Sequence, residues 1–236
     1  MEFKKYIPNF LTLLNLFCGC IALVFVADLN CEYAFFFVAL GIFFDFFDGF
    51  FARKFNVAGP LGVQLDSLAD MVTSGVVPGF LMYKLLANDY MLGLNSYLPY
   101  LGFVITLGAC YRLANFNIDT RQSDTFIGLP TPANTLFFLS LPLIHWEQIY
   151  VEFTNSTVFC YILISLCFLS AFVMNANIPL FSLKIKNFSV TKYKLQLLFV
   201  FISIVLIAFF NYLGVAITIV QYVVLSVFNN LFFSKK

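Results

Sequence analysis

Charged residues are scarce in this chain. Only 11% of its 236 residues are Asp, Glu, Lys or Arg, whereas 61% are hydrophobic and 33 are phenylalanine. In a water-soluble domain about a quarter of the residues are charged, and the polar residues here are too few to cover a surface that faces water. The sequence therefore predicts an integral membrane protein. Its net charge of +1, without a long basic patch, argues against a nucleic-acid partner.

Cysteine and histidine are also too few and too scattered to indicate a metal centre. The six cysteines form no CxxC pair, and five of them fall inside apolar runs, where cysteine behaves as a small hydrophobic residue. The single histidine, His145, stands beside Trp146, and Trp is typical of membrane boundaries. We therefore do not expect this histidine to be catalytic.

Long apolar runs dominate the sequence instead. A helix needs about 20 mainly apolar residues to cross about 30 Å of hydrocarbon, and the chain contains eight candidate segments. They are Ile7–Ala27, Tyr33–Phe51, Val63–Leu86, Tyr97–Asn117, Thr131–Trp146, Thr157–Asn175, Leu195–Tyr212 and Val215–Phe233. The predicted fold class is all-α, a polytopic bundle of about eight transmembrane helices. We expect residues 1–236 to form a single membrane domain, with core spans at about 7–176 and extra C-terminal spans at about 195–233.

The basic residues predict the orientation of these helices. Cytoplasmic loops carry an excess of Lys and Arg, and a cytoplasmic N-terminus puts 12 of the 13 basic residues on that side, with only Lys84 on the other. An even number of spans follows, with both termini in the cytoplasm. The connection at 179–194 is expected to lie along the membrane lipids, with its lysines near anionic headgroups.

Four aspartates interrupt the apolar pattern. Asp45 and Asp48 are three residues apart, and Asp66 and Asp70 are four apart, so each pair projects from one face of a helix in adjacent turns. Both pairs stand near the predicted cytoplasmic ends of their helices. Since the short loop between them makes the two helices antiparallel neighbours, we expect the four carboxylates to converge.

Convergent carboxylates need compensating positive charge, because they repel one another and lose hydration on burial. Mg²⁺ favours a few carboxylates together with substrate phosphates and water. Two metal ions about 3.5–4 Å apart would share a carboxylate and suit phosphoryl chemistry, so we expect a pair of Mg²⁺ or Mn²⁺ ions. Gly49 leaves room for a ligand beside the helix backbone, and Arg53, one turn beyond Asp48, could clamp a phosphate.

Two other interpretations of the aspartates remain open. The acids and Arg53 could form a salt-bridge cluster that only holds the helices together. However, one arginine cannot neutralise four acids, and carboxylates within a membrane usually mark a functional site. The acids could also form a proton or cation pathway in a transporter. Such a pathway usually places its acids across the membrane depth, whereas these gather at one level.

The segment from Asp45 to Asp70 reads D-x2-D-G-x2-A-R-x8-G-x3-D-x3-D. In all eight fixed positions it resembles the signature of the CDP-alcohol phosphotransferase family. The resemblance implies a membrane enzyme that moves a phosphoryl-linked group from a CDP-activated donor to an alcohol and releases CMP. It also implies a homodimer.

The resemblance implies a role for each aspartate as well. By this resemblance, Asp45 and Asp48 are ligands of one metal ion, and Asp66 is shared by both ions. Asp70 is the general base for the acceptor hydroxyl and lies close to the second ion.

Four other residues are expected to contact the donor. Gly49 and Arg53 correspond to family positions that contact the CDP-linked group. Asn9 and Thr12, in the first span, could either cap that helix or reach the nucleotide.

Three further stretches are similar to the bacterial and archaeal branch of this family that uses serine: IPNFLTLLNLFCG, ACYRLANFNI and FIGLPTPAN. L-serine brings a carboxylate, which needs a cation with fixed donors. Arg112, at the cytoplasmic end of an apolar helix, is the best candidate, and Asn115 and Asn117 are possible hydrogen-bonding neighbours. Ordinary snorkelling of Arg112 to the membrane boundary is the alternative.

The expected reaction is transfer of the phosphatidyl group from CDP-diacylglycerol to L-serine at the cytoplasmic face of the inner membrane. The nearest alternative is the same chemistry with glycerol 3-phosphate or an inositol phosphate, which would call for several cations around the pocket; this chain supplies few. A prenyltransferase would normally show two separate Asp-rich motifs, and here there is one. An ion-coupled transporter is the alternative from another class.

Overall fold

The computed structural model describes residues 6–87, 97–119, 126–144, 157–181 and 194–233, which are almost entirely helical. The α-helices are α1 (Tyr6–Ala27), α2 (Cys31–Lys54), α3 (Pro60–Asp70), α4 (Val77–Leu86), α5 (Val104–Ile118), α6 (Thr131–Ser140), α8 (Thr157–Asn175) and α9 (Lys194–Phe233). The shorter elements are the π-helix η2 (Met71–Val76), the 3-10 helices η4 (Leu98–Phe103) and η5 (Leu141–Leu143), and the strands β1 (Phe126–Ile127) and β2 (Pro179–Leu180). Within these described ranges, five helices are long and apolar enough to cross a membrane, so the protein is an all-α membrane protein.

Local sequence signals set the helix ends around the aspartates. Helix α2 ends with Arg53 and Lys54 in its last turn, where cations complement the helix dipole. Gly59 then precedes α3 in an extended conformation, and Pro60 takes the first helical position, where its missing N–H costs no hydrogen bond. The short α2–α3 connection therefore keeps both aspartate pairs near one end of the bundle.

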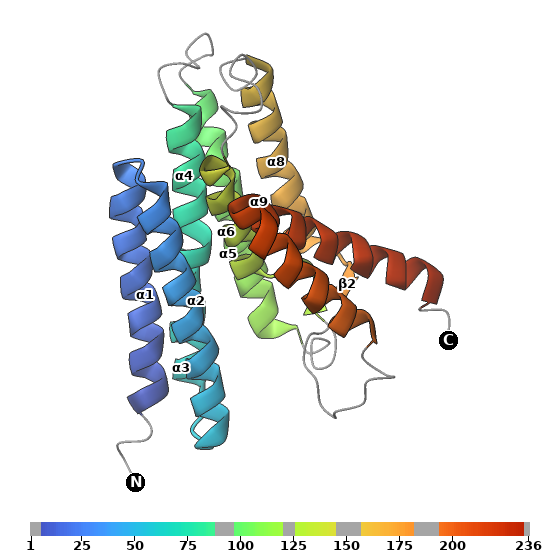
Figure 1. Ribbon diagram of the computed structural model, residues 1–236. Helices are drawn as coiled ribbons and strands as arrows, with labels where there is room; N and C mark the ends of the chain where they lie inside the picture. The colour runs from blue at the N-terminus through green and yellow to red at the C-terminus, as the bar shows by residue number, and fades with distance from the viewer. Residues whose placement is uncertain (1–5, 88–96, 120–125, 145–156, 182–193, 234–236) are drawn as a thin grey trace.

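Helix α1 is the common neighbour of the two aspartate-bearing segments. It packs along α2 and also contacts α3, η2 and α4. Figure 1 shows α1 and α2 side by side, with α3 behind the lower part of α2. The first helix can therefore reach carboxylates from both sides of the α2–α3 connection.

The eight expected spans correspond to helical segments of unequal length. The five long segments are α1, α2, the η4–α5 pair, α8 and α9. The segment expected at Val63–Leu86 is helical from Pro60 to Leu86 but is divided by η2. The segment expected at Thr131–Trp146 is helical only over 131–143 among the described residues, and its last two residues lie outside them. At about 1.5 Å per residue this helix is shorter than a hydrocarbon core.

Helix α9 contains the two C-terminal segments predicted from the sequence. Its backbone leaves the helical region at Asn211, with φ 48° and ψ −121°, where two helices join across a kink. Figure 1 shows the two halves as arms that diverge from this point. The two predicted segments, Leu195–Tyr212 and Val215–Phe233, therefore correspond to the two halves of α9, and the kink lies at the end of the first one.

Two short strands, which the sequence did not indicate, connect the end of α8 to the start of α6. Strands β1 and β2 pair antiparallel, with Phe126 opposite Leu180. Gly128 follows β1 with φ +76°, and a Cβ atom there would collide with the carbonyl oxygen of Met174. Only glycine fits this left-handed position without strain, so the turn brings the chain close against the end of α8.

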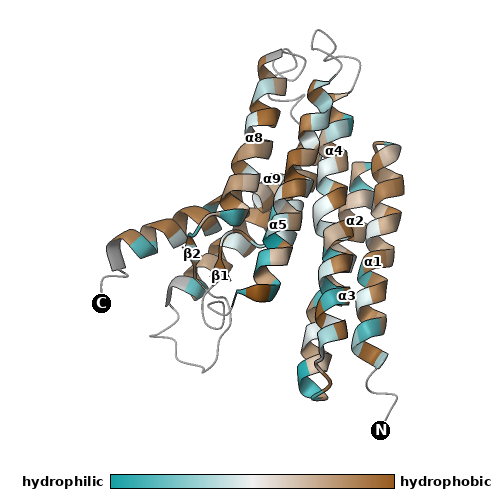
Figure 2. Ribbon diagram, turned by 180° about the vertical axis from the view of Figure 1, so that it is seen from behind, coloured by the Kyte–Doolittle hydropathy of each residue, from teal (hydrophilic) through white to brown (hydrophobic). Residues whose placement is uncertain are grey.

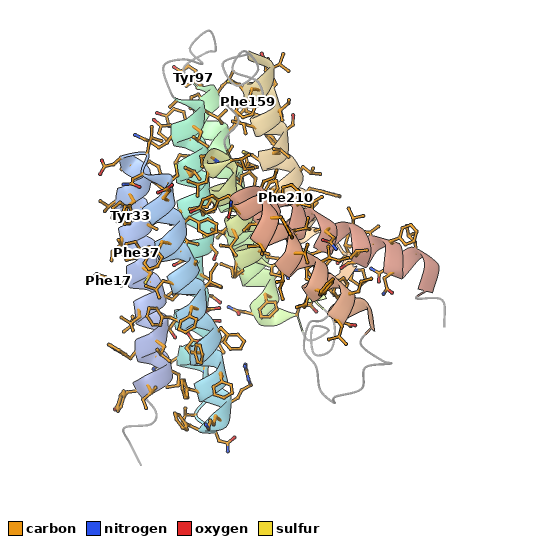
Figure 3. All side chains as sticks on the ribbon, viewed as in Figure 1. Phe17, Tyr33, Phe37, Tyr97, Phe159 and Phe210 are labelled. Atoms are coloured by element: carbon orange, nitrogen blue, oxygen red, sulfur yellow. The ribbon has the colours of Figure 1, made fainter. Side chains whose placement is uncertain are left out.

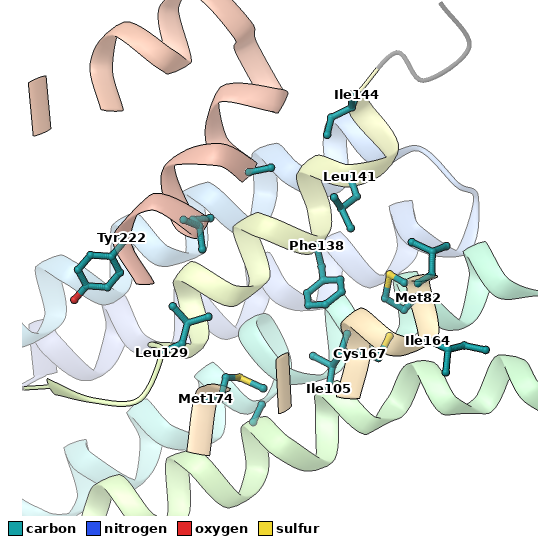
Figure 4. Close-up of a cluster of buried hydrophobic side chains, with 14 of the residues drawn as sticks. Met82, Ile105, Leu129, Phe138, Leu141, Ile144, Ile164, Cys167, Met174 and Tyr222 are labelled. Atoms are coloured by element: carbon teal, nitrogen blue, oxygen red, sulfur yellow. The ribbon is translucent and has the colours of Figure 1, made fainter. Parts of the chain in front are cut away.

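Two clusters of buried apolar side chains hold the bundle together. The larger one joins α4, α5, α6, α8 and α9, and Figure 4 shows Phe138 of α6 pointing toward Ile105 of α5 and Cys167 of α8. The smaller one joins α1, α2, α4 and α6 and includes Ala22 and Val38. Helix α6 takes part in both clusters and links the two halves of the bundle.

The outer faces of the helices carry large apolar side chains. Phe17 is 61% exposed and Tyr33 is 55% exposed, and Phe17 points away from the bundle in Figure 3. Such surfaces suit contact with lipid chains. Hydrophilic residues gather instead on the lower parts of α3 and α5 in Figure 2, at the end that carries the aspartates.

The close approach of η4 to α4 can be tested at Gly102. A Cβ atom there would lie 2.5 Å from the backbone nitrogen of Tyr83 and 2.9 Å from the carbonyl carbon of Met82. We expect Gly102→Ala to lower the free energy of unfolding by about 1–3 kcal/mol, measured as a lower midpoint of thermal unfolding in detergent. Gly59→Ala is the matched control, because no heavy atom lies within 4 Å of a Cβ there. Equal midpoints for the two variants would contradict this packing.

Candidate active site

Carboxylate oxygens from two helices meet at one point. Asp45 and Asp48 come from α2 and Asp66 from α3, and one oxygen of each lies within 4.8 Å of the others. The negative charges of Asp66 and Asp70 both act on Asp45. The structure therefore brings three of the predicted metal ligands together, and the fourth borders them.

The three clustered carboxylates fit a divalent cation. Asp48 is 6% exposed, and Asp45 Oδ1 is buried without a hydrogen-bond partner among the described residues. Carboxylates this close repel one another strongly where water is excluded, because the local dielectric constant is low. A cation that takes oxygen ligands would satisfy the unpartnered oxygen and offset the repulsion.

Helix α1 supplies polar side chains to two of the aspartates. The Thr12 hydroxyl donates a hydrogen bond to Asp48 Oδ2 over 2.5 Å, and the Asn15 amide nitrogen donates to Asp70 Oδ1 over 3.1 Å. Both side chains are fully buried, at 3% and 0% exposure. Thr12, for which the sequence left a helix cap and a nucleotide contact open, therefore holds a site carboxylate.

Small residues shape the end of the site near the α2–α3 connection. The Arg53 guanidinium folds back over Gly49, where a Cβ atom would lie 3.2 Å from Nη1. Its positive charge acts on Asp48. Asn9 Oδ1 lies 3.6 Å from the position of a Cβ on Gly62, an ordinary contact distance, which places Asn9 of α1 beside the first turn of α3.

A π-helix, η2, directly follows Asp70. In this wider helix backbone bonds connect residues five apart, and such segments are frequent at functional sites. The Thr135 hydroxyl of α6 donates to the carbonyl oxygen of Ser74 over 2.8 Å, and the Thr106 hydroxyl of α5 donates to that of Gly75 over 2.9 Å. Two neighbouring helices therefore hold the segment that sets the direction of Asp70.

Arg112 lies in a polar cavity of about 330 Å³ between α5, β1 and the end of α8. Its side chain is 6% exposed and donates a long hydrogen bond, 3.4 Å, to the carbonyl oxygen of Gly128. Asn115 and Asp119 line the same cavity, and the charge of Asp119 acts on Arg112. Because the guanidinium is enclosed by protein, the geometry contradicts simple snorkelling to the membrane boundary.

Asn117 lies away from this cavity. Its amide nitrogen donates to Ser67 Oγ over 2.9 Å, next to Asp66. Residues two positions apart project from different sides of a helix, and Asn115 therefore faces the cavity while Asn117 faces α3. The structure brings together two of the three residues predicted to bind serine and separates the third from them.

Sequence reasoning did not single out Asn15, Asp119 or Asn175. Asn15 had a signal, since an amide inside an apolar span needs a partner. Asp119 and Asn175 line the cavity with Arg112. They meet because β1 pairs with β2 and holds the end of α8 near α5, which no local pattern indicates.

Acidic side chains that converge at one end of a membrane helix bundle define an intramembrane polar site that suits a bound cation. Residues 5–166 match the family model described as CDP-alcohol phosphatidyltransferase. This match covers more than half of the chain and includes all four aspartates, and the chain belongs to this family. It is therefore a membrane transferase. Its acidic triad, which consists of Asp45, Asp48 and Asp66, fits the divalent-metal dependence of the family.

Several curated proteins resemble the chain over much of its length. The CDP-diacylglycerol–serine O-phosphatidyltransferase of Bacillus subtilis is 39% identical over 132 residues, which cover 54% of this chain and 70% of that protein. The protein of the same name from Helicobacter pylori is 29% identical over 206 residues, covering 85% and 81%. The archaetidylserine synthase of Methanothermobacter thermautotrophicus is 33% identical over 130 residues, covering 53% of each.

Charge repulsion in the triad predicts that Asp66→Asn changes the stability of the protein in opposite directions with and without bound metal. In the presence of a metal chelator, we expect the variant to unfold at a higher temperature than the wild type, because one of the repelling charges is gone. With Mn²⁺ at 100 times its dissociation constant, the wild type should gain about 2.7 kcal/mol, and the variant should gain little.

The matched control is Glu32→Gln, in the first turn of α2 at its opposite end. It should respond to Mn²⁺ as the wild type does. If Asp66→Asn gains as much stability from the ion as the wild type, the triad does not hold it.

Proposed function

We propose that this protein transfers the phosphatidyl group from CDP-diacylglycerol to L-serine and releases CMP. The observation that carries the proposal is the convergence of Asp45, Asp48 and Asp66 within 4.8 Å in a chain of this family. A relative that covers 85% of the chain is named for this transfer. The transfer is the function that the site and the comparisons support best.

The proposed site opens on the cytoplasmic face of the inner membrane. Arg53 and Lys54 end α2, and the start of α1 lies at the same end of the bundle in Figure 1. Basic residues favour the cytoplasmic side. The proposed topology has eight spans and cytoplasmic termini, counting α3–η2–α4, α6–η5 and each arm of α9 as one span. The family resemblance also supports a homodimer.

Two divalent ions, Mg²⁺ or Mn²⁺, are proposed at the carboxylates. Asp45 and Asp48 would hold one, Asp66 would be shared, and Asp70 would lie close to the second. The unpartnered Asp45 Oδ1 supports this arrangement. When bound, the ions would supply the positive charge that stabilises the phosphate oxygens and the departing CMP.

The donor is proposed to bind beside the α2–α3 connection. Arg53 would bind a donor phosphate through its planar guanidinium, and Gly49 would let the donor approach the backbone of α2. Asn9 lies across this end of the site on α1. Thr12 would act on the donor through Asp48, to which it is hydrogen-bonded.

Asp70 is the proposed general base. One of its carboxylate oxygens accepts the proton of the serine hydroxyl. The hydroxyl oxygen forms a bond to the phosphatidyl phosphorus, while the bond from phosphorus to the CMP oxygen breaks and CMP leaves with that electron pair. Atoms and charge balance without a further reactant.

The acceptor is proposed to bind through the cavity around Arg112. A guanidinium has five N–H donors, and a carboxylate could accept two of them in parallel. Asn115 lines the same cavity and would meet the acceptor there, whereas Asn117, which faces α3, lies away from it. Asp119 would attract the ammonium group of an amino acid and repel an acceptor that carries a phosphate.

The acceptor can be identified by a release assay with labelled CDP-diacylglycerol. The purified protein in lipid vesicles receives L-serine, glycerol 3-phosphate or an inositol phosphate in parallel. We expect CMP release to depend on serine, at a rate at least about tenfold above that with either phosphate. CMP release with a phosphate-bearing acceptor alone would contradict the choice of serine, and ion flux without CMP release would favour a transporter.

The role of Asp70 can be separated from donor binding. We expect Asp70→Asn to bind CDP-diacylglycerol with an affinity close to that of the wild type and to lower kcat by about 10²–10⁴-fold, the usual contribution of a general base. Binding is measured with labelled donor in the presence of Mn²⁺. Near-normal turnover in this variant would contradict the assigned role.

A further inference from the structure

Asn15 of α1 makes a direct side-chain hydrogen bond to Asp70. Its amide nitrogen donates to Asp70 Oδ1 over 3.1 Å, from a side chain with 0% exposure. We infer that Asn15 is a positioning residue, which selects the oxygen of Asp70 that accepts the proton of the acceptor. The inference rests on the proposed function of this site.

The hydrogen bond distinguishes the two oxygens of the Asp70 carboxylate. An ionised carboxylate accepts hydrogen bonds on both oxygens and donates none, which matches the amide nitrogen of Asn15 as the donor to Oδ1. With Oδ1 engaged by this donor, the direction of the carboxylate is fixed. Oδ2 is then the oxygen that takes the proton of the serine hydroxyl.

The surroundings of Asn15 are built to keep its amide in place. The Thr73 hydroxyl donates to the backbone carbonyl oxygen of Asn15 over 3.1 Å, which ties η2 to α1. Asn15 Oδ1 faces Gly41 of α2, where a Cβ atom would lie only 2.9 Å away. Glycine at 41 therefore provides the space in which the amide lies.

Packing alone does not account for this residue. Asn15 Oδ1 is buried without a hydrogen-bond partner among the described residues, and an unpartnered buried polar atom is costly. An apolar side chain of similar size would avoid that cost. Asparagine at this position is therefore explained by its amide donor, which points at the carboxylate next to the triad.

The test compares Asn15→Leu with the wild type in the CMP-release assay. Because a hydrogen bond to a charged group is lost, we expect kcat to fall about tenfold or more. The KM values for serine and for CDP-diacylglycerol should stay within about threefold. Gly41→Ala should give the same pattern, since its methyl group displaces the amide while Asn15 and Asp70 are both kept; this variant decides the question if Asn15→Leu does not fold.

Ser226→Leu is the control. Ser226 lies in the second arm of α9 with 0% exposure, and its hydroxyl donates to the carbonyl oxygen of Tyr222 over 2.7 Å. Because a larger side chain overpacks this buried position, the variant should lose thermal stability, yet keep kcat per folded protein within about twofold.

Two results would overturn the inference: unchanged kcat in both Asn15→Leu and Gly41→Ala, or an equal fall of kcat in Ser226→Leu. An inactive wild type would contradict the proposed function instead. The two failures are therefore distinguishable.

Discussion

Mutual repulsion among closely spaced carboxylates is the constraint on which this structure depends. Asp45, Asp48 and Asp66 place oxygens within 4.8 Å of one another at the end of a bundle that faces lipid over most of its surface. Such an arrangement is unfavourable unless positive charge is supplied, because low dielectric strengthens every like-charge contact. Arg53 supplies one positive charge nearby, and a bound cation would supply the remaining positive charge. The same repulsion that destabilises the protein without metal thus gives the site its affinity for one.

The remainder of the fold serves to keep these acids in place. Helix α1 donates hydrogen bonds from Thr12 to Asp48 and from Asn15 to Asp70, so one helix braces both aspartate-bearing segments. Hydroxyls from α5 and α6 hold the π-helix behind Asp70. Helix α6 also takes part in both apolar clusters. The packing of the bundle is therefore linked, through the π-helix, to the orientation of the Asp70 side chain.

Most of the site could be predicted from local spacing. Helical periodicity placed each aspartate pair on one face of its helix, and the short loop between the helices predicted that the two pairs meet. Composition predicted a membrane protein, and the length of the apolar runs predicted that it is all-α. What could not be predicted depends on contacts between distant segments. The pairing of β1 with β2 brings Asn175 near Arg112, and the face of α5 that packs on α3 separates Asn117 from Asn115. The short α6 and the π-helix result from tertiary packing, which hydropathy does not report.

The most direct test of the central claim is the position of a divalent ion in crystals of the protein grown with Mn²⁺, located by anomalous scattering. The account predicts a peak about 2–2.5 Å from oxygens of Asp45, Asp48 and Asp66, with the carboxylates converging on it. A peak elsewhere, or three carboxylates that turn apart with no ion between them, would contradict the account.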